Sequence, residues 1–373
     1  MSDHLTTTAT GVTTATSTDR PELRAAVEEI AADGWAGIQV RVNDCQGEWT
    51  GSAGVGELGS DAPPPTDGHF RIGSNTKTFT ATLVLLLVAD GLLGLDDPVD
   101  DHLPGYGLDR RITVRMVLQH TSGLFNHTGE YYEDGTTAPG IPWQGQEWVD
   151  NLLLTYRPEE LLRLSLAKPA RFEPGTDWSY SNTNYVLARL LVERLAGRPY
   201  AEEMHHRLLG PLGLTGTLVP DASPELPGPH AHGYYTYRDG EEWRTVDVTR
   251  SNPSWISAAG DMISTTRDLH VFFSALLGGR LLPAELMAEM RTPHTKFAYG
   301  LGLIVEETEA GTLYTHNGGF WGWGALMYGS PDGGTTLIAS LTTGDARLEF
   351  AETAAAFAKV QRTLLPLVFP PRS

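Results

Sequence analysis

The order in which strand-like and helical segments follow one another is the strongest constraint on this fold. Short strand-like runs separated by Gly- and Asp-rich turns fill residues 302–342, and a further pair at 37–42 and 49–55 lies near the start. Helical periodicity dominates the segment between them. One antiparallel sheet built from both ends of the chain accounts for this order. The sequence therefore predicts an α/β (α+β) fold in which helices 20–32 and 350–365 flank the sheet.

Three regions follow from this pattern. Residues 1–19 are rich in Thr and Ala and predict a disordered tail. Residues 20–79 and 251–373 would form the sheet domain, and residues 80–250 would form an inserted, mostly helical subdomain. The cleft between two such parts is where a ligand is expected.

Charge and composition limit the partners of the protein. The formal net charge is −19, so nucleic acid and anionic membrane surfaces would repel it. No apolar run approaches the ~20 residues that span a bilayer, and no signal peptide is visible. The sequence as written therefore predicts a cytoplasmic location, with secretion as the alternative if the native start lies upstream. The single cysteine, Cys45, excludes an internal disulfide. The oligomeric state stays open.

The segment Gly73–Phe79 carries the first chemical signal. Ser74 stands where a helix would start, and its hydroxyl could cap the free backbone N–H groups there. Lys77 follows three residues later, so both side chains would project from one face. A serine hydroxyl needs a base to become a good nucleophile, and a buried lysine can be that base. A capped core helix with one snorkelling lysine would show the same four residues, so the tetrad alone does not decide the function.

Two further motifs add to this signal. Tyr180-x-Asn182 lies between a Gly turn and a helix, and His316-x-Gly318 ends a strand. Together with the serine–lysine tetrad they supply a nucleophile, bases, an amide anchor and a basic strand. A related set, S-x-x-K, S-D-N and K-T-G, occurs in β-lactamases and penicillin-binding proteins. Taken singly, Tyr180 could be a core aromatic, Asn182 a helix cap and His316 a strand histidine facing water.

Six sequence blocks extend these motifs over residues 20–365. They are R-I-G-S-N-T-K (71–77), D-R-R-I-T-V-R (109–115), H-T-S-G-L (120–124), Y-S-N-T-N-Y (180–185), S-A-A-G (257–260) and Y-G-L-G-L (299–303). In this order the chain resembles the family of serine D-alanyl-D-alanine carboxypeptidases and class C β-lactamases. It is especially similar to the secreted Streptomyces D,D-carboxypeptidases. The resemblance implies the serine β-lactamase/D,D-peptidase fold.

The resemblance also implies a set of catalytic roles. Ser74 would attack the carbonyl carbon and become acylated. Lys77 and Tyr180 would share the proton transfer, with the phenol made a stronger base by the nearby ammonium. Asn182 would orient the lysine and donate to the substrate amide. His316 would help to relay the proton to the leaving group, and no metal or cofactor is implied.

Binding roles follow from the same resemblance and from the aromatic residues beside the H-x-G motif. The backbone N–H groups of Ser74 and Gly319 would form the oxyanion hole. The tryptophans that follow this motif would either line the substrate cleft or pack the sheet. The substrate-binding candidates are Trp255, Asn317, Gly318, Trp321 and Trp323.

The chain departs from the family at the site that binds a substrate carboxylate. The D,D-carboxypeptidases place an arginine directly after Y-G-L-G-L and threonines around the H-T-G triplet. The corresponding residues here are Ile304, Asn317 and Gly319. A bidentate cation is the best device for holding a carboxylate, so its loss puts carboxypeptidase specificity in doubt.

The sequence therefore predicts a serine hydrolase that forms an acyl-enzyme through Ser74. Its substrate would be a small molecule or short peptide, namely a D-amino-acid peptide, an amide or an ester, and β-lactams are candidate acylating ligands. The alternatives are an acyltransferase or transesterase on the same scaffold, or a penicillin-binding sensor with little turnover. The histidine pairs at 205–206 and 230–232 lack a third ligand at metal spacing, so no metal site is predicted.

Overall fold

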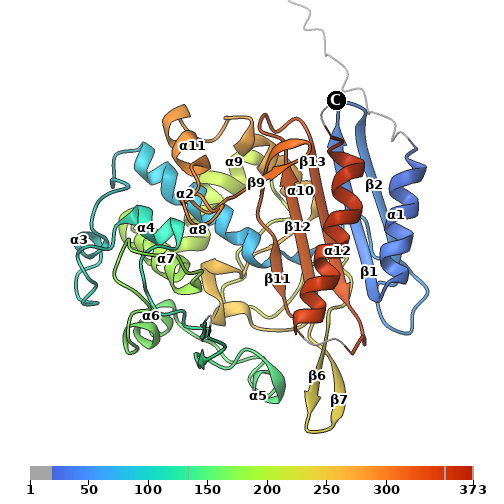
Figure 1. Cartoon of the computed structure of the whole chain (residues 1–373), viewed down its shortest axis with the longest axis horizontal. Helices are drawn as coiled ribbons and strands as arrows, with labels where there is room; N and C mark the ends of the chain where they lie inside the picture. Colours follow the sequence, from blue (N-terminus) through green and yellow to red (C-terminus); the bar gives the residue numbers. More distant parts are fainter. Residues whose placement is uncertain (1–18, 133, 348–349, 372–373) are drawn as a thin grey trace, which may run out of the picture.

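Strands from both ends of the chain form one antiparallel sheet in a computed structural model, which describes residues 19–371 apart from 133, 348 and 349. The strand order is β2-β1-β13-β12-β10-β9, with β11 paired to β12, and Figure 1 shows the N-terminal strands beside the C-terminal ones. The predicted sheet is confirmed, whereas the predicted tail lies almost entirely outside the described residues. The strands are β1 (Trp35–Asp44), β2 (Gly47–Gly54), β9 (Ile304–Thr308), β10 (Gly311–Thr315), β11 (Gly318–Phe320), β12 (Trp323–Gly329) and β13 (Thr336–Thr343).

Helices cover both faces of this sheet. Successive side chains of a strand point to opposite faces. Along β12, Leu326 and Tyr328 join the apolar layer beneath α1 and α12, whereas Ala325 and Met327 join the larger core that includes α10. The first and last helices therefore cover one face, as predicted. These helices are α1 (Pro21–Ala32), α10 (Thr266–Leu277) and α12 (Phe350–Val368).

The remaining helices lie on the other side of the molecule in Figure 1, around a central helix. This helix, α2, is buried at every position from Thr76 to Leu85, as expected for a helix that packs on all sides. It contacts α7, the short turn η1 (Gly73–Asn75) that precedes it, and the turn η4 (Ser257–Ala259). The helices of this part are α2 (Thr76–Ala89), α3 (Val99–His102), α4 (Val114–Gln119), α5 (Gly145–Asp150), α6 (Pro158–Leu166), α7 (Asn182–Ala196), α8 (Tyr200–Met204), α9 (Gly210–Leu212) and α11 (Ala284–Arg291).

Two features of the 80–250 segment differ from the expectation. Helical periodicity in the sequence runs over residues 148–166, but this segment is divided into α5 and α6, because Pro158 opens a new helix. A β-hairpin, which sequence periodicity did not indicate, projects below the sheet in Figure 1. The domain boundaries drawn from the sequence stay a prediction. The short strand pairs are β3 (Phe70–Arg71) with β8 (Ile263–Ser264), β4 (Glu130–Tyr131) with β5 (Thr137–Ala138), and β6 (Tyr234–Asp239) with β7 (Glu242–Asp247).

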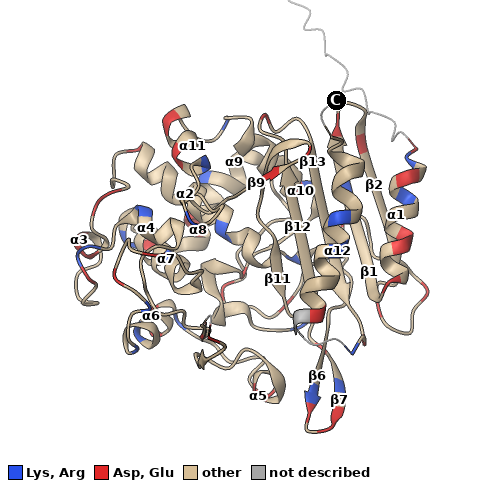
Figure 2. Ribbon diagram, in the orientation of Figure 1, with Lys and Arg blue, Asp and Glu red and all other residues tan. Residues whose placement is uncertain are grey.

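Charged residues mark the outside of the fold. Figure 2 shows them along α1, where exposed Glu22, Arg24 and Glu28 alternate with the buried apolar positions. Cys45 lies in the turn between β1 and β2, and its thiol is exposed. Within the described part of the chain, no helix is long and apolar enough to cross a membrane.

Candidate active site

Ser74 lies in a short 3-10 turn, η1 (Gly73–Asn75), which runs directly into α2. The predicted capping role of the Ser74 hydroxyl is wrong, because the cap positions of η1 and α2 are Ile72 and Asn75, and neither makes a side-chain cap. The hydroxyl instead meets Lys77 Nζ at 3.2 Å. Ser74 is half-buried, whereas its neighbours in the chain, Gly73 and Asn75, are buried.

Lys77 is fully buried and contacts three oxygen atoms. Its Nζ lies 3.2 Å from Ser74 Oγ, 2.9 Å from Asn182 Oδ1 and 2.7 Å from the Ala259 carbonyl. Burial disfavours the ammonium and lowers the pKa of Lys77 well below its ordinary value. A neutral amine has two N–H donors, which the amide oxygen and the carbonyl can accept. Its lone pair then faces the Ser74 hydroxyl, which is the geometry of a general base.

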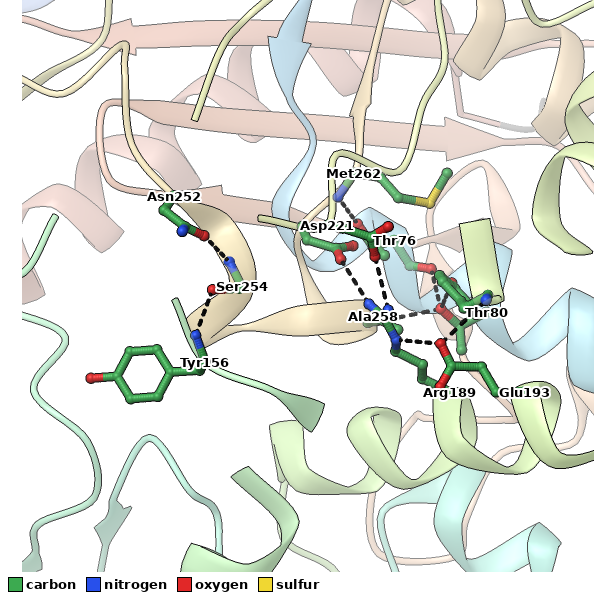
Figure 3. Close-up of polar contacts among 12 residues, drawn as sticks. Thr76, Thr80, Tyr156, Arg189, Glu193, Asp221, Asn252, Ser254, Ala258 and Met262 are labelled. Carbon is green, nitrogen blue, oxygen red and sulfur yellow. Dashed lines mark hydrogen bonds and ion pairs between the residues drawn. The ribbon is translucent and has the colours of Figure 1, made fainter. Parts of the chain in front are cut away.

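Two threonines of α2 hold the carbonyl that contacts this lysine. Thr76 Oγ1 accepts a hydrogen bond from the Met262 N–H at 3.2 Å, and Thr80 Oγ1 donates to the Ala258 carbonyl at 2.9 Å (Figure 3). These bonds fasten the segment on both sides of Ala259 to the helix that carries the lysine. The lysine and its carbonyl acceptor therefore keep a fixed separation.

Tyr180 and Asn182 approach the serine–lysine pair from the start of α7. The Tyr180 side chain hydrogen-bonds Ser74, and its ring centroid lies 4.6 Å from Lys77 Nζ. Burial raises the pKa of Tyr180 above its ordinary value, so the phenol is neutral in the resting site. The family resemblance implies that this phenol shares the proton transfer with Lys77 as a base, and that role stays a prediction. Asn182 Nδ2 donates to Thr128 Oγ1 at 3.1 Å, which turns its amide oxygen toward Lys77.

His316 lies directly after β10 and is buried. Its Nδ1 is 2.9 Å from the Asn317 carbonyl, and its Nε2 is 3.0 Å from the Tyr299 hydroxyl. A carbonyl only accepts, so Nδ1 carries the proton and Nε2 accepts from the tyrosine. Burial, reinforced by Lys77, lowers the pKa of His316 to about 3. The imidazole is neutral with both nitrogens engaged, so the expected proton relay would have to pass through Tyr299.

The predicted oxyanion hole is consistent with the backbone geometry. Strand β11 contacts η1, and a Cβ built on Gly73 would lie 2.5 Å from the oxygen and 2.7 Å from the nitrogen of Gly319. Similarly, a Cβ on Gly318 would lie 1.9 Å from the Ile72 carbonyl oxygen. Glycine at these positions lets the two backbones touch. The Gly319 backbone is therefore next to the turn that carries Ser74.

The substrate-binding candidates lie in different surroundings. Trp255 and Trp323 are buried in the larger apolar core and pack against Phe320, with ring centroids 5.7 and 6.4 Å away, and a substrate-binding role for them stays a prediction. Asn317 Nδ2 donates to the Tyr328 hydroxyl at 3.4 Å, in the layer beneath α12.

Trp321 remains a candidate for the substrate wall. It is half-buried, stacks on Trp143 with centroids 5.5 Å apart, and donates from Nε1 to the Trp143 carbonyl.

Several contacts of the site were not predicted. The Ala259 carbonyl and Thr128 have no sequence signal, because every residue has a carbonyl and threonine is common. Tyr299 and His120 open two of the sequence blocks quoted above, Y-G-L-G-L and H-T-S-G-L, but no role was assigned to either. Both are buried beside Tyr180, with ring centroids 6.3 and 4.4 Å from it.

Comparison with known proteins agrees with this geometry. Residues 23–362 match the family described as Beta-lactamase. The chain belongs to the beta-lactamase family. The fold predicted from the sequence is therefore confirmed, and the family and its relatives indicate a serine hydrolase.

Three relatives place the chain within the beta-lactamase family. A D-stereospecific amidohydrolase from Streptomyces sp. is 36% identical, with a TM-score of 0.78 over 92% of this chain and 99% of that chain. A D-amino acid amidase from Ochrobactrum anthropi SV3, solved with L-phenylalanine amide, is 26% identical, with a TM-score of 0.76 over 93% and 97% of the two chains. A penicillin-binding protein of Bacillus subtilis (strain 168) is 28% identical over 300 residues, or 77% of this chain. The chain spans 63% of the length of this curated relative.

Proposed function

We propose that this protein is a serine hydrolase that cleaves amides of D-amino acids through an acyl-enzyme on Ser74. The observation that carries the proposal is the threefold contact of Lys77, which leaves the lone pair of a neutral amine directed at the Ser74 hydroxyl. The amide class is supported by two relatives, one named a D-stereospecific amidohydrolase and one a D-amino acid amidase.

The first half of the reaction forms the acyl-enzyme. Lys77 takes the hydroxyl proton of Ser74 while Oγ bonds to the substrate carbonyl carbon. Negative charge then develops on the carbonyl oxygen, and the backbone N–H groups of Ser74 and Gly319 would stabilise it. The C–N bond breaks, and the leaving amine receives a proton from the Tyr180 phenol, which is replaced by the proton held on Lys77.

The second half restores the enzyme. A water molecule gives a proton to the Lys77–Tyr180 pair and attacks the ester carbonyl. The bond to Ser74 Oγ breaks, the hydroxyl regains its proton, and a free D-amino acid leaves. A neutral phenol suits this donor and shuttle role, whereas a phenolate would compete with the lysine as base.

The chain lacks the cation that would select substrates with a free C-terminal carboxylate. Ile304, at the position where the D,D-carboxypeptidases carry an arginine, is a half-buried residue of β9 paired with Thr315. An isoleucine cannot replace the bidentate hydrogen bonds of a guanidinium. The proposal therefore includes weak discrimination in favour of a free C-terminal carboxylate.

The test is intact-mass detection of a Ser74 adduct together with product analysis. The probes are D- and L-phenylalanine amide, a D-alanyl-D-alanine peptide with a free or amidated end, a simple ester and a β-lactam. We expect turnover of the D-amide at least ~10-fold faster than that of the L-amide, and loss of the adduct in Ser74→Ala. Ser223→Ala, which changes an exposed serine, is the matched control. Normal turnover by Ser74→Ala, or a strong preference for free acids, would contradict the proposal. An added amine acceptor separates hydrolysis from acyl transfer.

A further inference from the structure

We propose that His120 is a positioning residue that fixes the Tyr180 phenol, and that it acts as a neutral imidazole protonated on Nε2. This inference rests on the proposed role of Tyr180 in proton transfer. The histidine does not contact Ser74 in the described structure, so it would act only through the tyrosine.

His120 accepts hydrogen bonds from the backbone on both sides of Tyr180. Its carbonyl accepts a hydrogen bond from the Ser179 N–H at 3.1 Å, and its Nδ1 accepts one from the Ser181 N–H at 3.2 Å. Its ring lies against the tyrosine ring, with centroids 4.4 Å apart. Three contacts from one residue therefore set both the backbone and the ring orientation of Tyr180.

The hydrogen bonds at Nδ1 determine the tautomer. Besides the Ser181 N–H, Nδ1 meets Asn184 Nδ2 at 3.1 Å. The orientation of that amide is set by the Ser122 hydroxyl, which accepts from the Leu124 N–H and donates to Asn184 Oδ1 at 2.6 Å. Two donors therefore point at Nδ1, which cannot carry a proton of its own. A neutral ring must then be protonated on Nε2.

The surroundings of Nε2 disfavour a charged ring. This nitrogen is buried without a hydrogen-bond partner among the described residues. The rings of Tyr180, Tyr185 and Tyr299 enclose the imidazole, with centroids 4.4, 5.3 and 4.9 Å away. Burial, with smaller contributions from Lys77 and His316, lowers the pKa of His120 well below its ordinary value. The ring thus remains neutral beside a lysine that must itself change protonation state.

The backbone of His120 provides a second reason for a special role. It ends α4 in the left-handed conformation, with φ of 65°, which few residues other than glycine adopt without strain. Asparagine tolerates this conformation and places an amide oxygen where Nδ1 stands. Glutamine is also polar but moves its oxygen one bond further away. A comparison of His120→Asn with His120→Gln therefore distinguishes the effect of a hydrogen-bond acceptor at the Nδ1 position from the effect of any polar side chain.

Single-turnover acylation by a simple ester gives the acylation rate constant and the substrate Kd separately. We expect His120→Gln to lower the rate constant at least ~10-fold with Kd changed less than about twofold, because small misplacements of a catalytic group are costly. His120→Asn should keep the rate constant within about threefold of the wild type. Equal rate constants for the two variants, or a loss confined to Kd, would overturn the proposal.

A double-mutant cycle separates positioning from general destabilisation. If His120 acts through the Tyr180 hydroxyl, then His120→Gln should change the acylation rate less than about twofold in a Tyr180→Phe background. His127→Asn, which alters another buried histidine that instead contacts Thr183 and Trp255, should give additive effects with Tyr180→Phe. Full additivity for His120→Gln would overturn the proposal.

Nitrogen-15 NMR of the histidine side chains tests the tautomer without reference to activity. We expect His120 to show the Nε2–H tautomer and no charged form from about pH 5 to 9, although free histidine titrates near 6.5. An Nδ1–H tautomer or a titrating ring would refute it. If the wild type forms no Ser74 adduct with any probe, the proposed function fails, while the tautomer measurement still decides the claim about His120.

Discussion

Burial keeps two groups around Ser74 neutral, and this decides the direction of proton transfer. It lowers the pKa of Lys77 and raises the pKa of Tyr180. A neutral amine can accept the serine proton, whereas a neutral phenol can only give one up. In the proposed mechanism the two steps of proton transfer therefore fall to different residues, and both depend on water being kept away from the lysine.

Acylation should become faster as Lys77 loses its proton. The ammonium has no lone pair, so the acylation rate should fall as pH falls through the pKa of Lys77 in the folded protein. Because burial lowers this pKa well below 10.5, the plateau should be reached at a pH where free lysine is still charged. Single-turnover acylation by an ester from about pH 5 to 10 measures the profile. A rate that levels off only above the ordinary pKa of lysine would argue against the assignment.

The variant Lys77→Arg tests the same role of Lys77 as a base, because a guanidinium stays protonated at every accessible pH. We expect the acylation rate to drop at least ~10²-fold, which is the usual contribution of a general base to the rate, and the pH dependence of acylation to disappear. Lys168→Arg changes an exposed lysine and should leave the profile intact.

At the scale of elements, the contact between η1 and β11 sets the spacing of the proposed oxyanion hole. We expect Gly73→Ala to lower the acylation rate about 10²-fold, the usual cost of losing one oxyanion donor. The added Cβ would lie 2.5–2.8 Å from backbone atoms of Gly319 and must push the strand away. The substrate Kd and the rate constant from single-turnover kinetics measure the effect.

Gly91→Ala is the control for backbone strain in this experiment. Gly91 also has a positive φ, of 71° compared with 50° for Gly73, but an added Cβ there meets no atom within 4 Å. Gly91→Ala should lose about 1 kcal/mol of stability, since alanine is strained in this region, and Gly73→Ala should lose more because its Cβ also clashes with the Gly319 backbone. Equal losses of acylation rate in the two variants would show that strain, and not the contact with β11, limits the reaction.

Elements with a strong periodic pattern were predictable from the sequence, and those held by tertiary contacts were not. Helix α10 spans Thr266–Leu277, as its amphipathic pattern predicts. The β6–β7 hairpin was missed although Asp239-Gly240 is a hairpin turn signal, because its flanking residues lack clean alternation. Its strands are fixed instead by contacts such as the Gly145 N–H with the Tyr235 hydroxyl, at 2.7 Å.

The candidate site also has residues that the sequence predicts and contacts that only tertiary packing creates. Ser74, Lys77, Tyr180 and Asn182 were predictable because a specific chemistry requires those residue types at those spacings. The carbonyl of Ala259 was not, since no side chain marks it.

The partner of His316 Nε2 could also not be predicted. Tyr299 reaches it because strand pairing brings both close to Ile304, which bridges Tyr299 and pairs with Thr315. Sequence motifs identify the groups that react, whereas the atoms that fix their protonation states come from packing.

At the scale of the whole molecule, a partly buried cluster of charges joins α7 to the segment that contacts Lys77. Arg189 of α7 lies 2.8 Å from Asp221, 3.0 Å from Glu193 and 3.9 Å from the buried Asp261 (Figure 3 shows the first two). The last distance is too long for a hydrogen bond. Asp261 is thus a carboxylate that gains little from its cation and loses its hydration on folding.

The stability of the fold should therefore depend on the protonation of Asp261. Burial raises the pKa of Asp261 to about 7, above the value near 3.8 of an unperturbed Asp. The folded state binds this proton more tightly than the unfolded state, so the free energy of unfolding decreases as pH rises between these two values. Above about pH 7 the carboxylate is ionised in both states, and the full cost is present.

Asp261→Asn removes this cost while Arg189 keeps Asp221 and Glu193 as partners. We expect the Tm of the variant, measured relative to the wild type, to be at least about 2 °C higher at pH 8 than at pH 5. Asp332→Asn is the control, and it should lower the Tm. Hydrogen bonds from Ser330 and Gly334 lower the pKa of Asp332, so its carboxylate is ionised and stabilises the fold equally at both pH values. A Tm difference between Asp261→Asn and the wild type that does not change with pH would mean that Asp261 is already ionised at pH 5, and that Arg189 stabilises its charge across 3.9 Å.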